Sequence, residues 1–168
     1  MSDVSNVKLG VCSVTFNNVA LGHTKGGVTV TYAPSYHDIT VDQYGETIVG
    51  KRLLGEKLSA KVPLAETTLA NLQVAIPEGT TSGSKLTIGS SVGDALEDNA
   101  HQLVLHPIAN DSDNLDDDVV IHKAVVVSPI EISYKNDGEK IYEVEFDAML
   151  DETKSDGNYL GFVGDSTS

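Results

Sequence analysis

Cysteine and aromatic residues are scarce in this 168-residue chain, and long apolar runs are missing. A single cysteine, Cys12, excludes an internal disulfide and a thiolate metal cluster. Because its neighbours are apolar, we expect a buried and unreactive thiol. No apolar run approaches the ~18 residues that a membrane helix needs. The polar residues 1–8 lack the hydrophobic region of a secretion signal, so we expect a protein that is not secreted.

Basic residues are also few, with 11 Lys and Arg against 25 Asp and Glu, which gives a formal charge of −14. Residues 1–84 hold 7 acids and 6 bases, whereas residues 85–168 hold 18 acids and 5 bases. So acidic a chain repels phosphates, so we expect it to be a poor nucleic-acid binder. The acidic half is either a solvated surface or a surface that repels an anionic partner.

Residues that favour β-structure are abundant: Val, Ile and Thr together number 42, a quarter of the chain. Short alternating segments separated by Gly, Asn and Asp predict a mainly β fold in one domain. Within residues 54–62, the apolar Leu54, Leu58, Ala60 and Val62 are predicted to share one face. Strands are predicted over residues 7–16, 28–32, 35–42, 54–62, 85–90, 102–108, 119–127, 130–135 and 140–150.

One helix is predicted, over residues 64–76, where Leu69, Leu72 and Ile76 recur at helical spacing. Thr67 or Thr68 is the candidate N-cap, and Pro77 stops the helix. A helix this short is stable only when it packs on a sheet.

The segments 130–135 and 140–150 flank Asn136-Asp137-Gly138, which is typical of a hairpin turn. Alternation gives this predicted hairpin one apolar face and one acidic face. Its acidic side chains are Glu131, Glu143, Glu145 and Asp147. Carboxylates in such a row more often form a solvated face than an acid–base pair.

No motif indicates an enzyme, a metal or a cofactor. The loop 79–85 lacks the spacing of a phosphate-binding loop, and the five histidines lack zinc-site spacing. Residues 111–118 hold five carboxylates but not the order of an EF-hand, so a solvated loop is expected, with calcium binding as the lesser alternative.

Four stretches together resemble the major tail tube protein of long-tailed, siphovirus-like bacteriophages. The first is residues 14–30, where two predicted strands flank Leu-Gly-His-Thr-Lys-Gly-Gly-Val, and the second is residues 39–45 with Val-Asp-Gln-Tyr-Gly. The third is residues 55–76 with Leu-Ala-Glu-Thr-Thr-Leu-Ala-Asn-Leu. The fourth combines residues 123–129, the strand 141–148 and the Leu-Asp-Glu-Thr-Lys that follows it. Their order and spacing cover roughly residues 8–160. The acidic stretch 111–118 has no counterpart in that pattern.

The resemblance implies a β-sandwich or partial barrel with one flanking helix. It also implies a single tail-tube domain over residues 1–168, with terminal arms at 1–7 and 151–168. Such subunits close into hexameric rings through continuous sheets, and the rings stack into a tube. Residues 41–53 are the candidate loop between rings, centred on Asp42, Gln43, Tyr44, Gly45 and Glu46.

The resemblance further implies a structural protein of the virion tail, present in the host cytoplasm before assembly. Its partners would be further copies of itself, a tape-measure protein, and tail terminator or tip proteins. DNA would pass through the lumen without specific binding, so Glu131, Glu143, Glu145 and Asp147 are candidates for a lumen that repels phosphate, with an outward position as the alternative. Other readings are the inner tube of a contractile injection machine or type VI secretion system, and a carbohydrate-binding or adhesive β-sandwich. Scarce aromatics disfavour the last.

Overall fold

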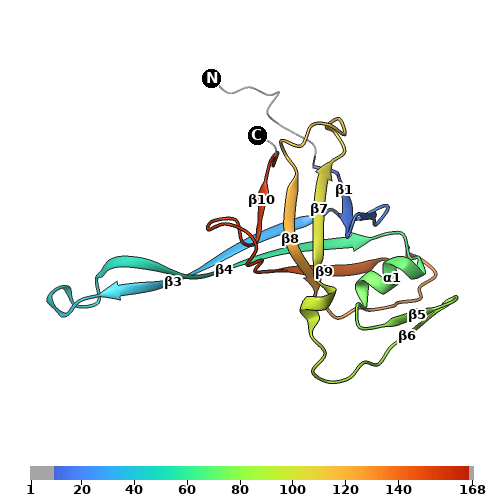
Figure 1. The fold of residues 1–168 in the computed structure, drawn as a ribbon, viewed down its shortest axis with the longest axis horizontal. Helices are drawn as coiled ribbons and strands as arrows, with labels where there is room; N and C mark the ends of the chain where they lie inside the picture. Colours follow the sequence, from blue (N-terminus) through green and yellow to red (C-terminus); the bar gives the residue numbers. More distant parts are fainter. Residues whose placement is uncertain (1–9, 167–168) are drawn as a thin grey trace.

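A computed structural model describes residues 10–166, which form a mainly β fold around one large antiparallel sheet with a single α-helix (Figure 1). This confirms the predicted class. The strands are β1 (Cys12–Phe16), β2 (Val19–Ala20), β3 (Thr29–Thr40), β4 (Ile48–Leu64), β5 (Thr80–Ser82), β6 (Lys85–Thr87), β7 (His101–Pro107), β8 (Val119–Val126), β9 (Tyr142–Met149) and β10 (Gly161–Val163). The helix is α1 (Leu69–Ala75), and two 3-10 turns are η2 (Asp42–Tyr44) and η3 (Leu96–Asn99).

The large sheet runs in the order β2-β1-β7-β8-β9-β4-β3, and β10 adds to β8. The segment after β2 joins distant parts of this sheet. Leu21 N donates to Val14 O of β1, and Lys25 N donates to Pro63 O of β4. Thr24 of this segment also forms an isolated antiparallel β-bridge with Leu64 of β4. The sheet therefore curls into a partial barrel.

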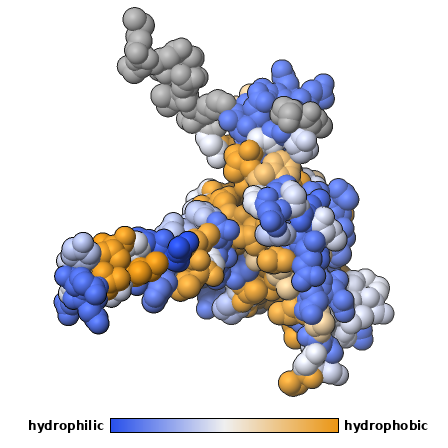
Figure 2. All heavy atoms as spheres, turned by 60° about the vertical axis from the view of Figure 1, so that its left-hand side comes forward, coloured by the Kyte–Doolittle hydropathy of each residue, from blue (hydrophilic) through white to orange (hydrophobic). Residues whose placement is uncertain are grey.

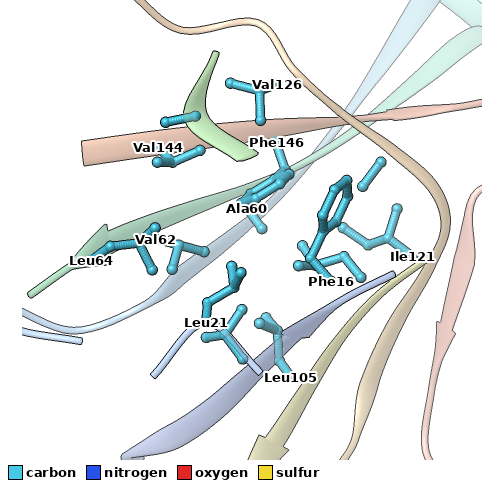
Figure 3. Close-up of a cluster of buried hydrophobic side chains, with 14 of the residues drawn as sticks. Phe16, Leu21, Ala60, Val62, Leu64, Leu105, Ile121, Val126, Val144 and Phe146 are labelled. Carbon is cyan, nitrogen blue, oxygen red and sulfur yellow. The ribbon is translucent and has the colours of Figure 1, made fainter. Parts of the chain in front are cut away.

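The inside of this barrel is the hydrophobic core (Figure 3). Alternation places Ala60 and Val62 of β4 beside Phe146 and Val144 of β9, and all four are fully buried. Phe16 packs on Phe146 with ring centroids 5.1 Å apart. Each fully buried large side chain stabilises the fold by about 1.5–3 kcal/mol.

Helix α1 follows β4 and closes one end of the core. Thr68 Oγ1 accepts a hydrogen bond from Asn71 N at 3.2 Å, which identifies Thr68 rather than Thr67 as the N-cap. The helix ends before Pro77, as predicted, but residues 64–68 precede it because Leu64 still belongs to β4. Asn71 is buried and its Nδ2 donates to Leu21 O, which ties α1 to the segment that closes the barrel.

The predicted strand 130–135 and its hairpin at 136–138 are wrong, because residues 127–141 form no regular strand. The reason is competition for β9. This strand pairs with β4 through residues 142–147 and with β8 through residues 146–149. Val127 N and Ser128 Oγ also bond the backbone of Glu145. Long-range pairing therefore outweighs the local turn signal.

Other boundaries also differ from the prediction. Segments 28–32 and 35–42 merge into β3, and residues 41–53 are not a single loop, because β4 begins at Ile48. The sequence also missed β5, which pairs with β6. Residues 7–9 of the first predicted strand and the candidate arm 1–7 lie outside the described residues. In the other candidate arm, residues 151–166 run back against β8 and form β10.

Candidate functional site: an exposed hairpin arm and an acidic sheet face

A long hairpin projects from the barrel (Figure 1). β3 pairs with β4 from Thr29 opposite Lys61 to Thr40 opposite Ile48, whereas β9 pairs with β4 only as far as Ser59. Beyond Ser59 the two strands continue alone. We call residues 32–58 the arm and the rest of the described chain the body. None of the seventeen buried hydrophobic residues of the core lies in the arm.

The arm nevertheless carries many exposed apolar and aromatic side chains, and Figure 2 shows orange surface on the projection. Eight of the twenty exposed large hydrophobic residues belong to it, although the arm is a small part of the chain. They are Tyr32, Tyr36, Val41, Tyr44, Ile48, Val49, Leu53 and Leu54. Exposed apolar surface gathered in one place is typical of a surface that contacts another protein.

Register explains how these side chains are arranged. Cross-strand partners share a face, so Tyr32 and Leu58 continue the face on which Ala60, opposite Val30, is buried in the core. A bulge between Ser35 and Tyr36 shifts the register and leaves Leu54 without a cross-strand partner. Leu54 is 69% exposed, although alternation predicted it on one face with Leu58, Ala60 and Val62. The core-facing side of the sheet therefore extends into the arm. Leu58 still packs against the core, and the residues farther along the arm are exposed.

The outer edge of β3 is also open. Among the described residues, β3 pairs with β4 alone along its whole length. A long unpaired strand edge presents backbone donors and acceptors to any strand that approaches it. Two polar contacts lie within the arm, because the Tyr32 hydroxyl donates to Glu56 and Lys51 Nζ donates to Asp38. The hydrogen bond to Glu56 raises the pKa of Tyr32.

The predicted inter-ring residues Asp42, Gln43, Tyr44, Gly45 and Glu46 form the tip of this arm. η2 makes the turn, and Gly45 closes it at a φ of 61°, in the left-handed region that glycine adopts without strain. Tyr44 is 66% exposed at the tip. The segment that the resemblance assigned to contacts between rings is thus the part of the arm farthest along the hairpin from the body.

The predicted acidic residues occupy one outer face of the body. Glu143, Glu145 and Asp147 alternate along β9 with side chains of the core. Glu131 reaches the same face from the irregular segment 127–141 and lines, with Glu143 and Glu145, an open cavity of about 450 Å³. The structure therefore brings these three carboxylates together, whereas Asp147 does not line that cavity.

Lysines of β4 partly neutralise this face. Lys61 Nζ lies 3.0 Å from Glu143 Oε2, and Lys57 Nζ lies 3.0 Å from Asp147 Oδ2. The hydrogen bond to Asp147 raises the pKa of Lys57. Within residues 10–166, no ion pair involves Glu131 or Glu145. In the sequence, Lys57 and Lys61 alternate with the apolar residues of 54–62, but the sequence alone does not give the pairing register between β4 and β9.

A further pair lies at the rim of the same cavity. Lys25 Nζ lies 2.5 Å from Glu139 Oε2. The hydrogen bond from Lys25 lowers the pKa of Glu139. This pair ties the irregular segment 127–141 to the segment that closes the barrel.

The acidic loop 111–118 connects β7 to β8. Asp118 is buried and its Oδ1 lies 2.6 Å from His106 Nδ1. Asn110 Nδ2 donates to Asp117 at 3.1 Å. In the part of the chain that the structure describes, no three His, Cys, Asp or Glu side chains are grouped so that they could hold a metal ion. No helix within residues 10–166 has the length and apolar character of a membrane span.

In comparisons with known proteins, no family model and no curated protein matches this chain.

Proposed function

We propose that this protein is a structural subunit that polymerises as stacked hexameric rings into the tail tube of a long-tailed bacteriophage, the conduit for DNA ejection. The arm is the observation that carries the proposal. An isolated two-stranded hairpin is marginally stable in water, and this one exposes apolar side chains along its length. A second copy of the chain that covers the arm would stabilise the hairpin and bury its exposed apolar side chains.

Charge favours the arm as the place where copies meet. Residues 32–58 hold four acids and three bases, for a net charge of −1. All remaining residues together carry −13. Like charges repel when two bodies approach, whereas a nearly neutral arm can contact an acidic body without that cost. Contact of an arm with the body of the next copy is heterologous, and such contacts generate rings or stacks.

The acidic face supports the conduit part of the proposal. Glu131, Glu143, Glu145 and Asp147 with the paired Lys57 and Lys61 keep a net charge of −2 per subunit. Repeated around a ring, that face would present a negative wall to DNA. Such a wall repels phosphates, so DNA slides without specific binding. The tape-measure protein and the terminator or tip proteins are proposed as the other partners, in the virion tail.

Electron microscopy of the purified full chain at high concentration tests the proposal. Rings or tubes with a central hole are expected from the wild type. The double variant Leu53→Ser/Leu54→Ser should stay monomeric, because it removes apolar contact surface from the arm. Its matched control is Ile88→Ser/Val92→Ser, which changes two exposed apolar residues outside the arm and should still assemble. Monomers alone from the wild type would contradict the proposal.

One observation favours a second candidate, a carbohydrate-binding or adhesive module. Tyr32, Tyr36 and Tyr44 are each more than half exposed on the arm, and aromatic faces of this kind stack on sugar rings. Binding of the monomer to a glycan array, lost in Tyr36→Ala and Tyr44→Ala, would support that candidate. An inner tube of a contractile machine would give the same rings as the first proposal.

A further inference from the structure

Residues 156–164, which we call the strap, lie along β8 (Figure 1). β10 pairs with Val119–Ile121 of β8, which is the half of the β8 edge that β9 leaves open. His122 N donates to Leu160 O, and Gly164 N donates to Asp118 O. Gly161 lies so close to β8 that a Cβ there would meet Val120 O at 2.1 Å.

The strap also reaches the base of the arm. A groove of about 500 Å³ has Tyr32, Leu53 and Leu58 of the arm on one side and Tyr159 and Leu160 of the strap on the other. Those three arm residues belong to the apolar face described above, on which Tyr32 is opposite Leu58. The strap therefore borders the same surface that we propose a second copy covers.

Few contacts hold the strap in this position. β10 has three paired residues, whereas β3 pairs with β4 over twelve. His122 Nε2 lies 3.0 Å from Asn158 Oδ1, and the His122 ring packs on Phe162 with centroids 5.6 Å apart. Segments with so few paired residues open at a small fraction of the global free energy of unfolding.

We infer that the strap gates assembly. In the closed state it occupies the edge of β8 and narrows the approach to the base of the arm. Its release exposes a free edge on β8 and clears the base of the arm, whose apolar face is otherwise already exposed, and a second copy of the chain binds there. This inference rests on the proposed function, since the partner is the next tube subunit.

A reversible cross-link tests the gate in the full chain. In a Cys12→Ala background, Val119→Cys and Val163→Cys place two thiols on directly paired residues, at the spacing that a disulfide needs. Oxidation locks the strap closed, and reduction frees it. We expect tube formation, followed by light scattering and electron microscopy, to fall by about tenfold or more on oxidation and to recover on reduction.

The matched control places the disulfide where the strap is not involved. Thr15→Cys and Val104→Cys are paired between β1 and β7, and oxidation there should leave assembly unchanged. If the Val119→Cys/Val163→Cys variant assembled equally well when oxidised and when reduced, the proposal that the strap gates assembly would be overturned. The proposed function would not be affected by that result. Absence of assembly in the wild type and in every variant would overturn the proposed function and the gate with it.

Discussion

The body and the arm of this molecule use β-strands in opposite ways. All seventeen buried hydrophobic residues lie in the body, where the barrel closes around them (Figure 3). The arm buries none and exposes eight large apolar side chains, six of them on the same two strands that, nearer the body, help form the core. The difference shows that β3 and β4 are longer than the fold needs. The extra length adds little to the stability of a single chain and is suited to contacts between chains.

The strongest test of this comparison is a pair of truncations, one in each region. Phe146→Ala removes a fully buried ring and should lower the free energy of unfolding by about 3–5 kcal/mol. Leu54→Ala removes an exposed side chain of the arm and should change it by no more than about 0.5 kcal/mol. Urea denaturation of the monomer measures both. Similar losses for the two variants would show that the arm packs on the body and would remove the distinction.

Strand β9 and helix α1 are the parts of the body that the sequence predicted well. Residues 140–150 alternate between core and acidic side chains, and that alternation matches the burial of β9. The helix was predicted because one short segment holds a cap at Thr68, an apolar stripe and a stop at Pro77. The stripe consists of Leu69, Leu72 and Ile76. These signals are local, and the long-range contacts of the body agree with them.

The arm and the neutralised acidic face were not predictable in the same way. Tyr36 alternates with polar neighbours as core residues do, and only the strand pairing shows that no third strand covers it. The pairs Lys57–Asp147 and Lys61–Glu143 join residues far apart in the chain, so they depend on how β4 meets β9. Even a strong local turn signal, at Asp137 and Gly138, gave way to pairing of this kind.

A smaller effect tests whether the body unfolds as one unit. Thr68→Ala removes the N-cap of α1 and should cost about 1 kcal/mol. Thr67→Ala is the matched control one residue earlier and should be nearly neutral. If the barrel and α1 unfold together, circular dichroism and tyrosine fluorescence will report the same shift in urea midpoint. Separate transitions would show that α1 is not part of the cooperative body.

The smallest expected effect is a dependence on acid that also originates in the body. The hydrogen bond from Lys25 lowers the pKa of Glu139, and the hydrogen bond from the Thr153 hydroxyl lowers the pKa of Asp151, which is buried. A lowered pKa means that the folded state binds fewer protons than the unfolded state. The stabilisation is therefore complete above the ordinary pKa of a carboxyl group and is lost as the pH falls from about 5 to 3.

The double variant Glu139→Gln/Asp151→Asn should show a shallower loss of stability over that range than the wild type. Urea midpoints measured at each pH provide the comparison. Glu78→Gln/Asp137→Asn removes two exposed carboxylates and controls for the change in net charge. If this control flattened the profile as much as the double variant, acid sensitivity would arise from the overall charge of −14 rather than from contacts in the body. In that case protonation would also weaken repulsion between bodies, and acid would promote assembly through the arm even as it destabilised the barrel.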